Sequence, residues 1–172
     1  MFIWRHPERH AKNPRILLIA ALLFAMSLIA VHLQAQSASA KESALRAVGI
    51  QTVKAIAHGN PSYLVSIVDP QGILIGHDEP KLSAELFRNK IKERTGAYCE
   101  LFESGCKTSH NPAYTLGYVF NTAGDPLNAD LKFNINGNKA TLDYSEAGGD
   151  GIATFSYRFV GGRWYLYSIY FV

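Results

Sequence analysis

The sequence predicts an α+β domain in which helices come first and an antiparallel sheet follows from about residue 131 onward. Residues 43–58 place Leu45, Val48, Thr52 and Ile56 at near-helical spacing. Residues 131–159 instead alternate apolar with polar side chains, which is the two-residue period of a half-buried strand. Helices followed by a run of strands are typical of the α+β class.

Gly59 and Pro61 end the first predicted helix, because glycine adopts the left-handed cap conformation and proline cannot continue a helix. Residues 103–130 show no clear periodicity. Within them, Asn111-Pro112 is a start signal for a short helix to about residue 120, which Gly117 weakens. The other elements expected before the sheet are a short helix over 62–68, a buried strand over 73–75, a helix over 83–95 and a strand over 97–102.

The sheet is predicted from alternating segments joined by glycine turns. Leu131, Phe133 and Ile135 form one apolar face, and Asn136-Gly137 is a strong signal for a two-residue hairpin loop. The strands expected after it are a return strand over 140–144, a long strand over 153–159 and, after Gly161-Gly162, a terminal strand over 163–172.

The terminal strand is apolar on both faces, with Tyr165 and Tyr167 opposite Trp164 and Leu166. Such a strand needs cover on both faces, and the early helices can shield only one. The second cover is either the segment 103–130 or a second copy of the protein. We therefore expect a homodimer packed through the sheet, with Tyr165 or Tyr167 near its centre.

Residues 1–40 have the three parts of an export signal. Four basic residues precede the uncharged run 16–31, and Ala38-x-Ala40 then matches the small-residue cleavage pattern. The alternative is an uncleaved anchor over residues 16–33, which would be the only membrane contact. We expect an exported protein (periplasmic, secreted or tethered by that segment) with one α+β domain over 41–172.

The formal net charge of +3 falls entirely on this leader, and the acidic and basic residues from position 41 onward balance. Nucleic-acid binding depends mainly on neutralising phosphates, so we expect no nucleic-acid partner.

The two cysteines of the chain, Cys99 and Cys106, lie in the exported part. In an oxidising compartment an even pair predicts a disulfide, and the alternative is two buried free thiols. Six intervening residues do not match a redox or zinc motif, so we expect neither catalysis nor metal binding there.

The sequence contains no standard catalytic, phosphate-binding or metal-binding motif, and we expect no cofactor and no metal. The candidate general bases are His77, which follows the short strand over 73–75, and Asp143, on the polar face of a sheet strand. Arg158, on a neighbouring strand, and Tyr98 are the candidate ligand-binding residues.

The element order and the closing strand resemble the nuclear transport factor 2-like superfamily, whose members commonly end in a Gly-x-Trp-x-Leu strand. Gly162, Trp164 and Leu166 fit that pattern. The resemblance implies a curved sheet wrapped by helices into a cone, with a cavity and frequent dimers. No catalytic residue of the superfamily can be placed on this sequence.

Two classes of function follow. The first is an exported, non-catalytic module that binds a small molecule or a partner protein with its cone or its sheet face. The alternative is a small lyase, isomerase or hydrolase with His77 or Asp143 as general base in the cone. A cone filled by the domain's own aromatic rings would favour the module, whereas an open cavity holding a base beside a second polar group would favour the enzyme.

Overall fold

The computed structural model describes residues 37–76, 80–102, 115–122, 130–145, 149 and 151–171. The chain divides into two compact units, Met1–Lys41 and Glu42–Val172, of which the second contains the sheet. No helix within the described ranges is long and apolar enough to cross a membrane. The apolar run over 16–33 lies outside those ranges, so the export signal and the anchor both remain predictions.

The first helix covers residues 37–57 of the described chain and therefore already includes the small-residue stretch before the predicted start at 43. Its predicted stripe is correct, because Leu45, Thr52 and Ile56 are buried. Where the helix crosses the inner face of the sheet the two lie very close: a Cβ atom on Gly49 would stand 2.7 Å from the Phe133 ring.

The short elements that follow are α2 (Pro61–Ile67), β1 (Leu74–Ile75), α3 (Ala84–Glu93), α4 (Ala97–Leu101) and α5 (Leu116–Thr122). The strand expected over 97–102 is wrong, because this segment is the helix α4. Four of its five residues are buried (Ala97, Tyr98, Cys99 and Leu101), so the segment shows neither a clear helical period nor a clear strand period. In so short an apolar run periodicity does not separate the two.

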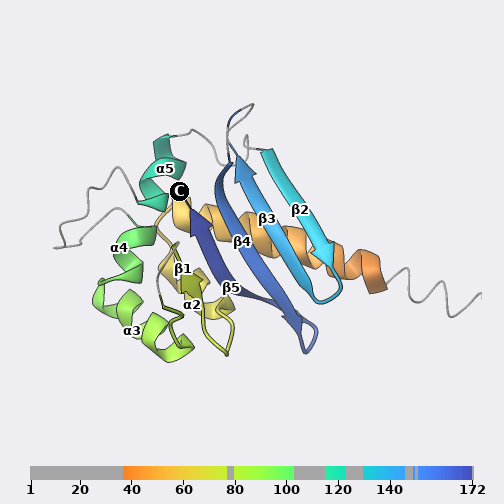
Figure 1. The fold of residues 1–172 in the computed structure, drawn as a ribbon, viewed down its shortest axis with the longest axis horizontal. Coiled ribbons are helices and arrows are strands. Elements are labelled where there is room, and N and C mark those ends of the chain that lie inside the picture. The colour runs from red at the N-terminus through yellow and green to blue at the C-terminus, as the bar shows by residue number, and fades with distance from the viewer. Residues whose placement is uncertain are drawn as a thin grey trace, which may run out of the picture. The chain divides into compact units, whose positions relative to one another are not determined.

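The sheet has the order β1-β5-β4-β3-β2, with β1 parallel to β5 and all other pairs antiparallel. Figure 1 shows the first helix passing behind these strands, while α3 and α4 lie beside the β1 edge. The predicted α+β class, with helices packed on a curved antiparallel sheet, is confirmed. The four long strands are β2 (Asp130–Asn136), β3 (Lys139–Ser145), β4 (Gly151–Val160) and β5 (Arg163–Phe171).

A β-bulge in β5 changes which of its side chains face the core. Ser156 pairs with Ser168 but Tyr157 pairs with Leu166, so Tyr167 is an extra residue in β5. After the bulge the buried position passes to Ile169, while Tyr170 is 38% exposed. The expectation that β5 is apolar on both faces is therefore wrong: one face is apolar, and the other carries tyrosines and Ser168.

We predict that Gly117→Ala destabilises the protein although alanine is the better helix former by about 1 kcal/mol. The new Cβ would stand 2.8 Å from the carbonyl oxygen of Leu101, where α5 meets α4. Such overpacking costs about 1–3 kcal/mol, so the free energy of unfolding measured by urea denaturation should fall. Thr122→Ala, at an exposed position of the same helix, should change it by less than about 0.5 kcal/mol. A more stable Gly117→Ala variant would contradict this packing.

Candidate functional site

The space between the helices and the inner face of the sheet, where the resemblance implies a cavity, is filled by aromatic side chains. Phe120, Tyr144, Phe155 and Tyr157 are each at most 1% exposed. The Phe120 ring lies 4.4 Å from the Tyr144 ring and 6.3 Å from the Phe155 ring, between centroids. Within the described residues, the interior is therefore occupied by the domain's own rings.

A small group of hydroxyls lies inside this core. Thr52 and Tyr63 both donate hydrogen bonds to the carbonyl oxygen of Val48, at 2.8 and 3.3 Å. The Tyr157 hydroxyl is buried and has no hydrogen-bond partner among the described residues. Burial raises the pKa of Tyr157, and the nearby Thr52 hydroxyl opposes that shift only partly. Burial likewise raises the pKa of Tyr63. Both phenols therefore act as neutral groups.

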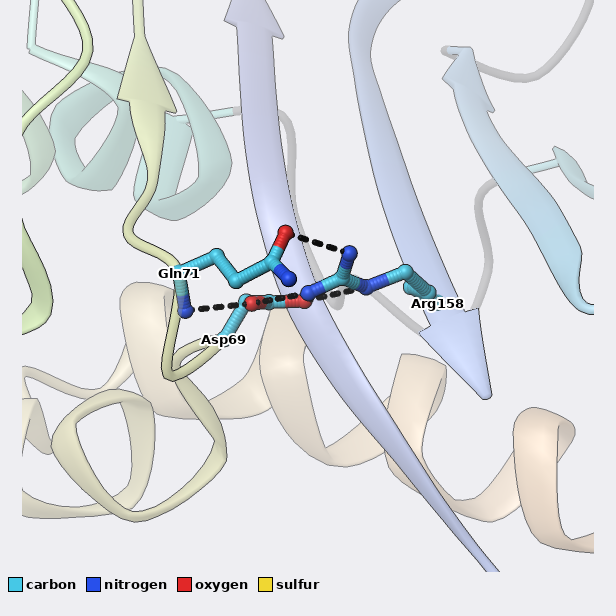
Figure 2. Close-up of polar contacts among 3 residues, drawn as sticks. All are labelled: Asp69, Gln71 and Arg158. Atoms are coloured by element: carbon cyan, nitrogen blue, oxygen red, sulfur yellow. Dashed lines mark hydrogen bonds and ion pairs between the residues drawn. The ribbon is translucent and has the colours of Figure 1, made fainter. Parts of the chain in front are cut away.

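Arg158, a predicted ligand-binding residue, is instead held by two residues of the loop between α2 and β1. Its guanidinium donates to both carboxylate oxygens of Asp69, at 2.8 and 2.6 Å, and to the Gln71 side-chain oxygen at 2.6 Å. Figure 2 shows these contacts in front of β5, so Arg158 reaches from β4 across that strand. Asp69 is fully buried, and its carboxylate also accepts a hydrogen bond from the backbone N–H of Gln71. The sequence analysis did not predict this ion pair.

Asp143 lies on the outer face of the sheet, away from the helices. It accepts a hydrogen bond from the Thr154 hydroxyl at 2.8 Å and stands opposite Lys132 and Thr154 in the strand register. The described part of the chain has cavities of about 140, 190, 450 and 470 Å³, and Asp143 lines none of these. His77, the other candidate base, lies outside the described residues.

The predicted disulfide is tested only in part. Cys99 is not a free thiol in the structure, but Cys106 lies outside the described residues. The pairing of Cys99 with Cys106 therefore remains a prediction. No group of side chains suited to hold a metal ion occurs among the described residues.

Tyr98, the remaining candidate, lines a groove between α2, α3 and α4 that we call the basic groove. Its volume is about 470 Å³, its cations are Arg88, Lys92 and Arg94, and Val65 and Ile91 lie with Tyr98 among its apolar lining. No acidic side chain of the described ranges lines it. The three cations were not predicted as a site from the sequence, because a charged helix face is most often ordinary solvated surface.

Two other cavities have mixed charge. One, of about 140 Å³ on the outer sheet face, has Lys81, Lys139 and Arg158 together with Asp69. Another, of about 450 Å³, lies between β1, α3 and α4 and has Lys90 and Glu100 on otherwise mostly apolar walls. In both, an acidic side chain already offsets part of the positive charge.

No protein-family model and no curated protein sequence matches the chain. Similar solved structures include an NTF-2 like protein of unknown function from Silicibacter pomeroyi, 16% identical over 78% of this chain and 97% of that one, with a TM-score of 0.43. A candidate ketosteroid isomerase from Parabacteroides distasonis is 16% identical over 72% of this chain and 85% of that one, with a TM-score of 0.39. A cystatin-like fold protein of unknown function from Nostoc punctiforme is 10% identical over 76% of this chain and 88% of that one, also with a TM-score of 0.39. At these identities and TM-scores the likeness concerns the course of the chain and transfers no activity.

We predict that Arg158→Met lowers the free energy of unfolding by about 3 kcal/mol, because it leaves the buried Asp69 carboxylate without its cation. The double variant Asp69→Asn/Arg158→Met should recover much of that loss, since it removes the buried charge as well. Urea denaturation of the single and double variants measures the difference. Equal stability of Arg158→Met and the wild type would show that the ion pair has no structural role.

We also predict that Tyr157→Phe leaves the protein as stable as before or stabilises it by about 1 kcal/mol. The change removes a buried hydroxyl without a partner and keeps the ring that fills the core. Tyr63→Phe is the matched control, because it removes a hydroxyl that does donate a hydrogen bond and should cost about 1 kcal/mol. If Tyr157→Phe is the more damaging of the two in thermal denaturation, its hydroxyl has a partner after all.

Proposed function

We propose that this chain is an exported, non-catalytic binding module. The observation that carries the proposal is the filled interior, where Phe120, Tyr144, Phe155 and Tyr157 occupy the space that a cone-shaped enzyme needs for its substrate. Export is supported by the three-part leader over residues 1–40.

The alternative, an enzyme with a general base in the cone, gains no support from the described residues. Asp143 has a polar neighbour in Thr154, but the pair lies on the outer face of the sheet and not in an enclosed cavity. Asp143 is half-buried on that open face, with no enclosed site around its carboxylate among the described residues.

We assign the partner contact of the module to the outer face of the sheet, with a second copy of the chain as its occupant. No described helix covers the face of β2–β5 that Figure 1 turns to the viewer. Tyr165 and Tyr167 on this face are half-buried and Tyr170 is exposed. Tyrosine is enriched at protein interfaces because it combines a large apolar ring with a polar tip.

The test is sedimentation equilibrium of the full chain in density-matched neutral detergent. We expect a dimer mass at micromolar concentration for the wild type and a monomer for Tyr167→Arg, which places like charges against each other across a two-fold interface. Lys132→Ala, on the far strand β2, should still dimerise, and far-UV circular dichroism should show that both variants are folded. A monomeric wild type would refute the dimer. Loss of the dimer in Lys132→Ala would show that the interface is not centred on Tyr167.

A further inference from the structure

We infer that the basic groove between α2, α3 and α4 binds a phosphate ester, with Arg88, Lys92 and Arg94 holding the phosphate oxygens. The inference rests on the proposed function, because it names the ligand class of a module that binds without turnover. It concerns the helical side of the domain and does not depend on the dimer.

The first argument is the uncompensated charge of α3. Arg88 and Lys92 stand four residues apart, which places them one turn apart on the same side of the helix, and like charges at this spacing destabilise a helix. Neither makes an ion pair with a described residue, and both are exposed at the groove. Elsewhere the same spacing carries opposite charges: Arg46 contacts Glu42 at 2.9 Å on the first helix. An anion in the groove would offset the repulsion between Arg88 and Lys92.

The second argument is the backbone of Arg94. This residue ends α3 with φ 56° and ψ 51°, and it is the one described non-glycine residue with a positive φ. Helices usually place glycine or asparagine in this left-handed conformation, because other side chains are strained there. The Arg94 guanidinium lies 5.9 Å from the centroid of the Tyr98 ring, which lines the groove. The strained position thus directs a third cation to the groove wall.

The third argument is the match between the groove and the ligand. Its volume of about 470 Å³ lies in the range of small-molecule sites. Arg88 and Lys92, in a groove without an acid among the described lining residues, suit a phosphate monoester, which carries nearly two negative charges at neutral pH, better than a singly charged carboxylate. Val65, Ile91 and Tyr98 offer an apolar surface to the organic part. A soluble phosphate monoester and the monoester headgroup of phosphatidic acid share this chemistry.

The experiment is calorimetric titration of the full chain in neutral detergent with phenyl phosphate, at about 150 mM NaCl so that long-range attraction is screened. We expect saturable binding with one site per chain, weaker binding of benzoate, and loss of affinity between about pH 7.5 and pH 5 as the ester becomes a monoanion. Arg88→Gln/Lys92→Gln should weaken binding at least about tenfold. Addition of phosphatidic acid, whose headgroup is a phosphate monoester, to the micelles distinguishes the sources: displacement of phenyl phosphate assigns a lipid headgroup, and no displacement assigns a soluble ester.

Two controls keep the inference falsifiable. Lys81→Gln/Lys139→Gln removes the two lysines of the outer-face cavity and should leave the affinity unchanged. Arg94→Gly should weaken binding, since it removes the third cation while glycine still adopts the left-handed conformation of the α3 cap. The inference is overturned if phenyl phosphate does not bind saturably, if binding survives Arg88→Gln/Lys92→Gln, or if it is lost with Lys81→Gln/Lys139→Gln. Each of these results leaves the oligomeric state unaffected, so the two proposals fail separately.

Discussion

The bulge at Tyr167 is the constraint on which the arrangement of the sheet depends. Before it, Trp164 and Leu166 point into the core, and after it Ile169 takes the buried position. Without the extra residue, a strict two-residue period would put Ser168 and Tyr170 into the core and Ile169 outside. Beside the bulge, the carbonyl oxygen of Leu166 accepts a hydrogen bond from the backbone N–H of Asp69 at 2.8 Å. This bond holds the loop before β1 against β5. One inserted residue therefore sets both the inner face and the edge of the sheet.

The cationic side chains of this domain have two different roles, which depend on the residues around them. Arg158 crosses β5 to a buried carboxylate, so three of its five N–H donors are already used and its role is structural. Arg88 and Lys92 have no such partner among the described residues, and Arg94 is held beside them by a strained backbone and an aromatic ring. A charged side chain that is saturated inside the fold has little left for a ligand, whereas exposed cations gathered around one groove retain their capacity to bind.

The interior of the described chain differs from the open cavity that the resemblance to cone-shaped folds implies. The elements that form a cone are present, but large rings have taken the place of a cavity, and the polar groups that the described chain places among them are hydroxyls such as those of Thr52 and Tyr157. Among the described residues, these rings fill the space between the helices and the sheet. We therefore propose that recognition takes place on the outside of this scaffold, at the basic groove or at the tyrosines of the open sheet face.

The sequence by itself determined the fold class, most of the elements and the hairpins of the sheet, because periodicity, caps and turn residues act over a few neighbouring positions. The role of Tyr98 as a candidate ligand-binding residue remains a prediction. Only the tertiary structure decided that 97–101 is a helix, that β5 shifts its phase at Tyr167, that Arg158 pairs with Asp69, and that three cations share one groove. The reason is distance along the chain: Asp69 and Arg158 are 89 positions apart, and the groove combines α2, α3 and α4. Contacts of this kind leave no local pattern in the residues that make them, so they arise only when the chain is folded.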